Sequence, residues 1–119
     1  MRHFALPPEA HWVSYWMARE GEGIEAPVKR LSTIMHELNH LHVDILKMDI
    51  EGGEYEVIED MLGSNIFPSQ VLVEFHHRFP TIGVMKTRKA IRQLHRAGYR
   101  IFCISPGGDD FSFVRLAME

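Results

Sequence analysis

The sequence has one cysteine, no long apolar run and no surplus of basic charge, and each shortage excludes a class of protein. Cys103 has no partner for a disulfide within the 119 residues, so a reducing compartment, the cytoplasm, is expected. No apolar stretch approaches the roughly 20 residues of a membrane-spanning helix, so no membrane span is expected. The formal net charge is −3, so no global basic field favours a nucleic-acid partner.

What is present is the composition of one modest globular domain. Hydrophobic residues make up 45% of the chain and charged residues 24%, a balance typical of a folded rather than a disordered protein. A length of 119 residues suffices for a single domain and is too short for two. Residues 1–30 contain the breakers Pro7-Pro8 and Gly21-Glu22-Gly23, so an irregular N-terminal segment is expected before the structured unit at 31–119.

From residue 31 onward, apolar periodicity and turn residues predict helices and strands in alternation. Helices are expected at Leu31–Leu38, Glu54–Leu62 and Val84–Ala97, and strands at Val43–Ile50, Gln70–His76, Tyr99–Ser105 and Phe111–Leu116. This order predicts parallel strands joined by right-handed crossover helices on the sheet faces, and the glycine-rich turn before the last strand predicts a closing antiparallel hairpin. The chain is therefore expected to form an α/β, Rossmann-like partial domain.

Polar side chains gather where two of the expected strands end. Asp49 and Glu51 lie at the end of the first strand, and Glu74 and His76 at the end of the next. Ligands of open parallel sheets bind beyond the carboxyl ends of the strands, so these four groups are expected to meet at one rim. A carboxylate or an imidazole at this rim could act as a general base and take the proton of a hydroxyl group on a bound ligand.

The residues around the first strand resemble a known family. The run Lys47-Met48-Asp49-Ile50-Glu51-Gly52-Gly53-Glu54-Tyr55 resembles the K-x-D-x-E-G-x-E-[YW] signature of FkbM-type methyltransferases, and Val71–His76 is similar to their next strand. The resemblance covers roughly residues 28–116 and identifies the chain as the C-terminal half of such a domain. It implies methyl transfer from S-adenosylmethionine, with a hydroxyl of a small molecule or glycan as the expected acceptor.

The resemblance also implies roles for individual residues. The catalytic group is expected to be Asp49, Glu51, Glu74 and His76; the cofactor contacts Asp49 and Gly52; and the substrate contacts Lys47, Glu54 and His77. No metal ligand is assigned. Plainer roles remain open, because Asp49 or Glu51 would also suit the N-terminus of the following helix, and Lys47 could pair with a neighbouring carboxylate.

The chain departs from the family pattern before residue 31. The strand, glycine-rich turn and second strand that hold most of the cofactor are not found, and Gly21-Glu22-Gly23 follows no strand, so a surface loop is the better interpretation. Binding of S-adenosylmethionine by this chain alone is therefore expected to be weak or absent. The strand at Val43–Ile50 would have a bare apolar edge, which calls for the missing N-terminal half, a second copy or a rearranged N-terminal segment as partner.

Two other functions remain open at the level of sequence. One is a non-catalytic half-domain, truncated or split, that serves as an interaction module. The other is a zinc hydrolase, because His36-Glu37-Leu38-Asn39-His40 is a literal H-E-x-x-H on an expected helix. The apolar positions of that helix would point both histidines toward solvent, which argues against a zinc site.

Overall fold

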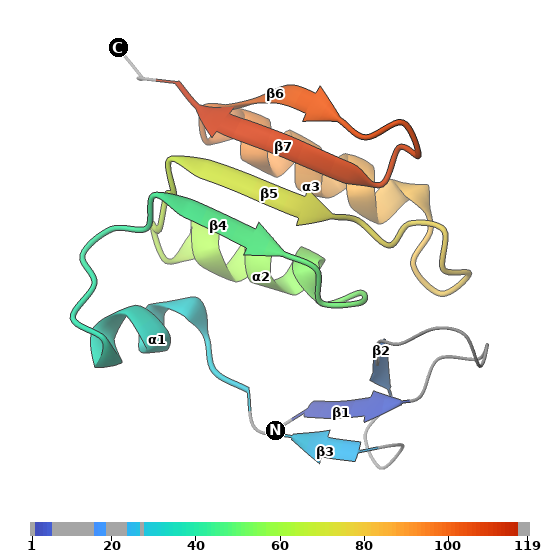
Figure 1. Ribbon diagram of the computed structural model, residues 1–119, viewed down its shortest axis with the longest axis horizontal. Helices are drawn as coiled ribbons and strands as arrows, with labels where there is room; N and C mark the ends of the chain where they lie inside the picture. Colours follow the sequence, from blue (N-terminus) through green and yellow to red (C-terminus); the bar gives the residue numbers. More distant parts are fainter. Residues whose placement is uncertain (1, 6–15, 19–23, 27, 117–119) are drawn as a thin grey trace.

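The computed structural model describes residues 2–5, 16–18, 24–26 and 28–116, and its main body is a four-stranded sheet with two long helices (Figure 1). The strands of this sheet lie in the order β4-β5-β7-β6. Their bounds are Ile45–Met48 (β4), Gln70–Glu74 (β5), Tyr99–Ile104 (β6) and Asp110–Arg115 (β7). The helices are Leu31–Glu37 (α1), Glu54–Gly63 (α2) and Val84–Arg96 (α3).

The strand directions confirm the expected partial Rossmann-like α/β fold. β4 and β5 are parallel and are joined through α2, while β7 runs antiparallel to both β5 and β6. The final strand therefore turns back through the hairpin and inserts between β5 and β6, and the pairing of β6 with β7 shifts register between Ile101 and Cys103 of β6. The parallel pairing of β4 and β5 puts their carboxyl ends side by side at one rim.

Both long helices cover the same face of the sheet, behind the strands in Figure 1. Apolar residues recur on α2 at Ile58 and Met61 and on α3 at Ala90 and Leu94, which is the spacing that aligns side chains on one side of a helix. They pack against alternate strand residues, and the whole core consists of Met48, Ile58, Met61, Val71, Val73, Phe75, Ala90, Leu94, Tyr99 and Phe113. Among the described residues, no helix covers the opposite face.

Helix α1 is shorter than the sequence predicts. It ends at Glu37, and Asn39 adopts a left-handed φ of 57°, so the chain turns away before His40. The Arg30 guanidinium ties the start of α1 to α2 through Asp60, with Nη2 and Oδ1 2.6 Å apart. None of the helices in the described part of the chain is long and apolar enough to cross a bilayer.

The N-terminal segment contains three short strands where an irregular chain was expected. β1 (Arg2–Ala5) pairs antiparallel with both β2 (Trp16–Ala18) and β3 (Ile24–Ala26). In the sequence, Pro7-Pro8 and Gly21-Glu22-Gly23 fall between these strands. Strands of three or four residues are too short to show a clear alternation of apolar and polar residues, so the sequence pattern did not predict them. Gly21-Glu22-Gly23, expected to form a surface loop, lies outside the described residues.

Candidate functional site

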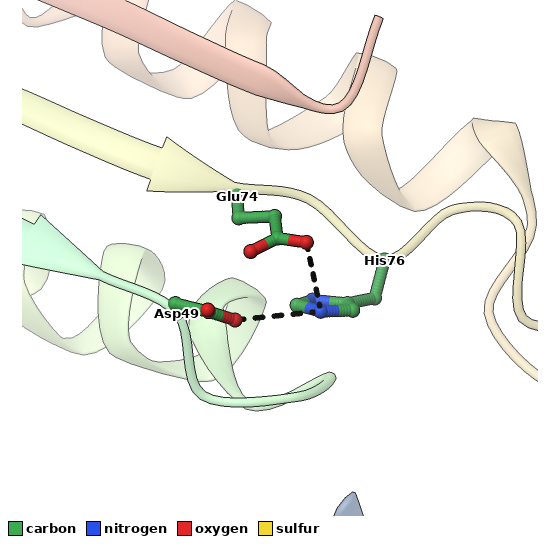
Figure 2. A group of neighbouring side chains, drawn as sticks. All are labelled: Asp49, Glu74 and His76. Atoms are coloured by element: carbon green, nitrogen blue, oxygen red, sulfur yellow. Dashed lines mark ion pairs between the residues drawn. The ribbon is translucent and has the colours of Figure 1, made fainter. Parts of the chain in front are cut away.

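The site lies at the rim where β4 and β5 end. The parallel register pairs Met48 with Val73, so Asp49 emerges beside Glu74. His76 follows two residues later, and Figure 2 shows its ring directed toward the carboxylates of Asp49 and Glu74. The convergence expected from the strand ends is therefore present in the structure.

The imidazole of His76 is the centre of the group. Its Nε2 atom lies 3.3 Å from Glu51 Oε2, 3.6 Å from Asp49 Oδ1 and 3.9 Å from Glu74 Oε1. The histidine side chain is only 7% exposed, whereas Asp49 is 49% exposed. Three carboxylates thus face one ring nitrogen at the edge of the core. A metal ion is one candidate occupant, because ligand atoms of Asp49, Glu74 and His76 all lie within 4.8 Å of one another.

A strained turn after β4 brings Glu51 to this group. Glu51 has a φ of 51°, which is uncommon for a residue with a side chain, and Gly52 has a φ of 104°. A Cβ atom on Gly52 would come within 3.2 Å of Ile82 Cδ1, so both conformation and space favour glycine. The turn therefore depends on the glycine of the sequence motif.

Glu54 holds the histidine from the other side, inside the protein. Its carboxylate is fully buried and accepts hydrogen bonds from His76 Nδ1 at 2.7 Å, from the His76 backbone N–H at 3.1 Å and from the Gly52 N–H at 3.1 Å. A carboxylate only accepts, so Nδ1 carries the proton and the lone pair of a neutral ring is on Nε2. Glu54 was expected to contact substrate; the structure shows its side chain fully buried, with hydrogen bonds to His76 and Gly52.

Tyr55 and Thr87 support the backbone behind the histidine. The Tyr55 hydroxyl accepts a hydrogen bond from the His76 N–H at 3.2 Å and shares a second one with Thr87 Oγ1 at 2.8 Å. Burial raises the pKa of Tyr55 above its ordinary value, so the phenol stays protonated at neutral pH. Tyr55 belongs to the sequence motif and could have been found from it, whereas nothing in the sequence singles out Thr87.

Two residues of the site have displaced pKa values. Partial burial, followed by the neighbouring Asp49 carboxylate, raises the pKa of Glu74 to about 7. Burial alone would lower the pKa of His76, but the hydrogen bond and charge of Glu54 outweigh it, with the charges of Glu51 and Glu74 in support, and the pKa ends above its ordinary value. Both groups can therefore exchange protons near neutral pH.

A hollow of about 240 Å³ opens beside these side chains, toward the face of the sheet that the described helices leave uncovered. Its polar lining includes Asp49, Glu74, Lys47 and Asp110. Lys47 is exposed and makes no ion pair with any described residue, so its expected contact with substrate is sterically open. Asp110 is the first residue of β7 and reaches the hollow because β7 pairs with β5, where it lies opposite Glu74.

His77 points away from the His76 group. Its Nδ1 lies 3.2 Å from Thr87 Oγ1 and its Nε2 lies 3.6 Å from Asp109 Oδ1. Arg78 pairs with the same Asp109 oxygen, with Nε 3.1 Å away. The structure therefore places His77 between α3 and the hairpin turn, and its expected contact with substrate stays a prediction.

The H-E-x-x-H sequence forms no comparable group. His36 lies on α1 and His40 beyond its end, both exposed, and Glu37 pairs with Lys29 at 2.8 Å. The two histidines line a shallow hollow of about 490 Å³ together with Met35 and with Ser64 and Ile66, which follow α2. The helix ends at Glu37, before His40, and among the described residues neither histidine belongs to a group of three ligand atoms close enough to share an ion, so the zinc hydrolase has no geometric support.

Comparison with known proteins decides the family. The family model described as "Methyltransferase FkbM domain" matches residues 4–101, which is most of the chain. The chain belongs to the FkbM methyltransferase domain family. The Lys47–Tyr55 motif is therefore an FkbM motif, and the rim that it builds is that of an FkbM domain.

Two curated relatives support the FkbM assignment. The "Probable methyltransferase-like protein 24" of Rattus norvegicus is 25% identical over 84 residues, and that of Homo sapiens is 24% identical over 84 residues. Each alignment covers 62% of this chain, and the chain spans only 23% of either relative. No solved structure matches the chain.

Proposed function

We propose that this FkbM chain carries the acceptor side of an S-adenosylmethionine-dependent methyltransferase that modifies a hydroxyl oxygen of a small molecule or glycan. The observation that supports it most is the convergence of Asp49, Glu51 and Glu74 on His76 Nε2. This convergence lies at the carboxyl-end rim, where α/β sheets bind their ligands. Family membership supplies the reaction class.

The chemistry of the rim suits this cofactor. The sulfonium of S-adenosylmethionine is a cation, and the rim offers several carboxylates around one imidazole. Asp49 is half exposed, and the backbone at Gly52 is free of a side chain, so these two residues would contact the cofactor. When bound, S-adenosylmethionine supplies an electrophilic methyl group.

The chain's own residues would prepare the acceptor hydroxyl. As the hydroxyl oxygen forms its new bond, its proton must pass to a base; His76 Nε2, which bears the lone pair when Nδ1–H donates to Glu54, would be that base. Glu54 fixes the tautomer, and Glu74, with a pKa of about 7, is a second proton acceptor at the same rim. Lys47 and the hollow beside it would orient the acceptor.

A methylation assay tests this role directly. The chain is incubated with millimolar S-adenosylmethionine and sugar, macrolide, lipid or peptide hydroxyls, and formation of S-adenosylhomocysteine is followed. The substitution His76→Asn should lower the rate by about 10²- to 10⁴-fold, the usual contribution of a general base. His95→Asn is the matched control, because His95 is exposed near the end of α3, and it should leave the rate unchanged. An unchanged rate in His76→Asn, or a methyl group found on nitrogen, would contradict the proposal.

Cofactor binding by the chain alone is a separate expectation. Titration with S-adenosylhomocysteine, followed by backbone amide NMR shifts, should move the Gly52 signal with a dissociation constant in the millimolar range. Adenosine at equal concentration serves as the control. Micromolar affinity would contradict the expectation that most cofactor contacts lie outside this chain, and the absence of any shift would contradict the assignment of Gly52.

A non-catalytic interaction module is the second candidate, and the uncovered face of the sheet favours it. Ile45 on edge strand β4 is 58% exposed, although it continues an apolar strand. A missing N-terminal half or a second copy of the chain would cover this edge. Failure of every acceptor together with an unmoved Gly52 signal would favour this function. In either case we expect a cytoplasmic location, because Cys103 is the only cysteine.

A further inference from the structure

We propose that Asp49, Glu74 and His76 form a binding site for one divalent transition-metal cation, with Mn²⁺ as the best-matched ion. These residues offer one ligand atom each, and the three atoms lie within 4.8 Å of one another. They come from the ends of two neighbouring parallel strands, so the sheet itself fixes their spacing (Figure 2).

The orientation of the histidine is the first argument for a cation. The side chain of His76 is only 7% exposed, and its Nδ1–H donates to the fully buried Glu54. Its Nε2 makes no hydrogen bond with any described residue and points at the carboxylates. Metal-binding histidines characteristically donate their second nitrogen to a carboxylate, which fixes the ring and directs the other lone pair at the ion.

The charge of the group is the second argument. Asp49, Glu51 and Glu74 each pair with His76, and within residues 28–116 no lysine or arginine forms an ion pair with any of the three. One imidazole carries at most one positive charge, so the group holds excess negative charge at the edge of the core. A divalent cation would neutralise that excess.

The mixture of ligands narrows the choice of ion. Carboxylate oxygens suit Mg²⁺, Ca²⁺ and Mn²⁺, whereas an imidazole nitrogen favours transition metals. Mn²⁺ accepts both ligand types. Glu51, 3.3 Å from His76 Nε2, is placed to supply a further oxygen.

The cation would also have a chemical use, which rests on the proposed function. Asp49 and Glu74 line the 240 Å³ hollow, so an ion held by them would face any acceptor bound there. A divalent ion stabilises negative charge that develops on an oxygen, and it would assist the loss of the hydroxyl proton. While the ion is bound, His76 Nε2 is a ligand and cannot accept that proton, which would then pass to solvent; the role of His76 as the base applies to the metal-free site.

A manganese titration tests the site without reference to methyl transfer. Mn²⁺ is added to metal-free protein, and the loss of its free-ion electron paramagnetic resonance signal gives stoichiometry and affinity. One ion should bind per chain, and Asp49→Asn or Glu74→Gln should each weaken binding at least tenfold. Both side chains are partly exposed, so these variants should keep the circular dichroism spectrum of the parent.

Two further variants distinguish Mn²⁺ binding at this site from non-specific binding to other side chains of the protein. Glu54→Gln should weaken binding by about 10- to 100-fold, as removal of a partner behind a metal-binding histidine does. The double substitution His36→Asn and His40→Asn removes the other histidine pair and should leave the affinity unchanged. Binding that survives Asp49→Asn and Glu74→Gln, or that is lost in the double variant, would overturn the site, as would the absence of one-to-one binding at millimolar Mn²⁺. If methylation continues in the presence of a chelator, the catalytic use of the cation is contradicted, whereas the binding site is not. If Mn²⁺ binds but no methylation occurs, the proposed function is contradicted, whereas the binding site is not.

Discussion

The two faces of the four-stranded sheet are built from alternate residues of the same strands, yet they differ sharply in how they are covered. On the face beneath α2 and α3, Val71, Val73 and Phe113 are at most 2% exposed. On the other face, Ile45 is 58% exposed, and Lys47 is exposed as well. Apolar residues on both faces are typical of a sheet that is covered by another layer on each side.

The candidate site joins these two regions. Glu54 and His76 are anchored on the covered side, where burial holds them in one orientation. Asp49 and Glu74 belong to the open side and line its hollow. The covered face therefore supplies the rigidity of the site and the open face its access, and substitutions on the two sides should have different effects.

The largest expected effect is the loss of a core side chain on the covered face. Phe113→Ala should lower the free energy of unfolding by about 3 to 5 kcal/mol, because it removes a fully buried ring and leaves a cavity. Ile45→Ala on the open face should cost less than about 1 kcal/mol. Urea unfolding followed by circular dichroism measures both values. Equal losses would show that the open face is packed in solution and would remove the contrast.

Next in size is the loss of the buried carboxylate under the site. Glu54→Ala leaves the Nδ1–H of His76 and the Gly52 N–H without their acceptor, while the His76 backbone N–H keeps the Tyr55 hydroxyl, and should destabilise the chain by about 3 kcal/mol. The matched change Glu74→Ala, on the open side, should cost less than about 1 kcal/mol. The same unfolding experiment decides between them, and a Glu74→Ala loss as large as that of Glu54→Ala would argue against separate roles.

The contrast between these two glutamates also shows where sequence reasoning stops. The strand ends predicted that Asp49, Glu51, Glu74 and His76 would meet, because parallel neighbours end at one rim whatever their loops do. The burial of Glu54 was not predictable, since an acidic residue in the first turn of a helix usually faces solvent. Its direction depends on the left-handed conformations of Glu51 and Gly52, which the sequence pattern does not specify.

Local backbone geometry also decides details that the sequence pattern leaves open. The helix expected at Leu31–Leu38 ends at Glu37, and the left-handed Asn39 turns the chain before His40, so the H-E-x-x-H sequence does not lie within one helix. His76 and His77 are neighbours in the sequence, but their Nδ1 atoms contact Glu54 and Thr87, respectively. Periodicity recovered helices α2 and α3 and all four strands of the main sheet, because burial on one side repeats regularly along them.

Alkaline pH should weaken the covered face specifically. Burial raises the pKa of Tyr99 to about 12, and its hydroxyl donates to the Pro68 carbonyl oxygen at 2.5 Å. Because the folded-state pKa is above the unfolded value of about 10, the neutral phenol stabilises the fold fully below pH 10, and this contribution is lost as pH rises toward 12.

The loss attributable to Tyr99 should be about 2 kcal/mol, given a displacement of this order for a buried group. The variant Tyr99→Phe should be less stable at pH 8 but should lack this part of the decline. Unfolding midpoints of both proteins between pH 8 and 12 measure the difference. Parallel declines would mean that the hydroxyl is not held in the core.

The smallest effect on stability should come from a charge on the open face, and it tests what that face is for. Ile45→Lys on edge strand β4 replaces a 58% exposed side chain and should change the free energy of unfolding by less than about 0.5 kcal/mol. A charged edge resists pairing with another chain, so sedimentation should show less self-association than the parent at equal concentration. The variant Ile101→Lys, on the other edge strand with 40% exposure, is the control that separates a general solubility effect from one at β4. Equal changes in both variants would indicate non-specific association, whereas a change confined to Ile45→Lys would identify the β4 edge as the surface that requires a partner.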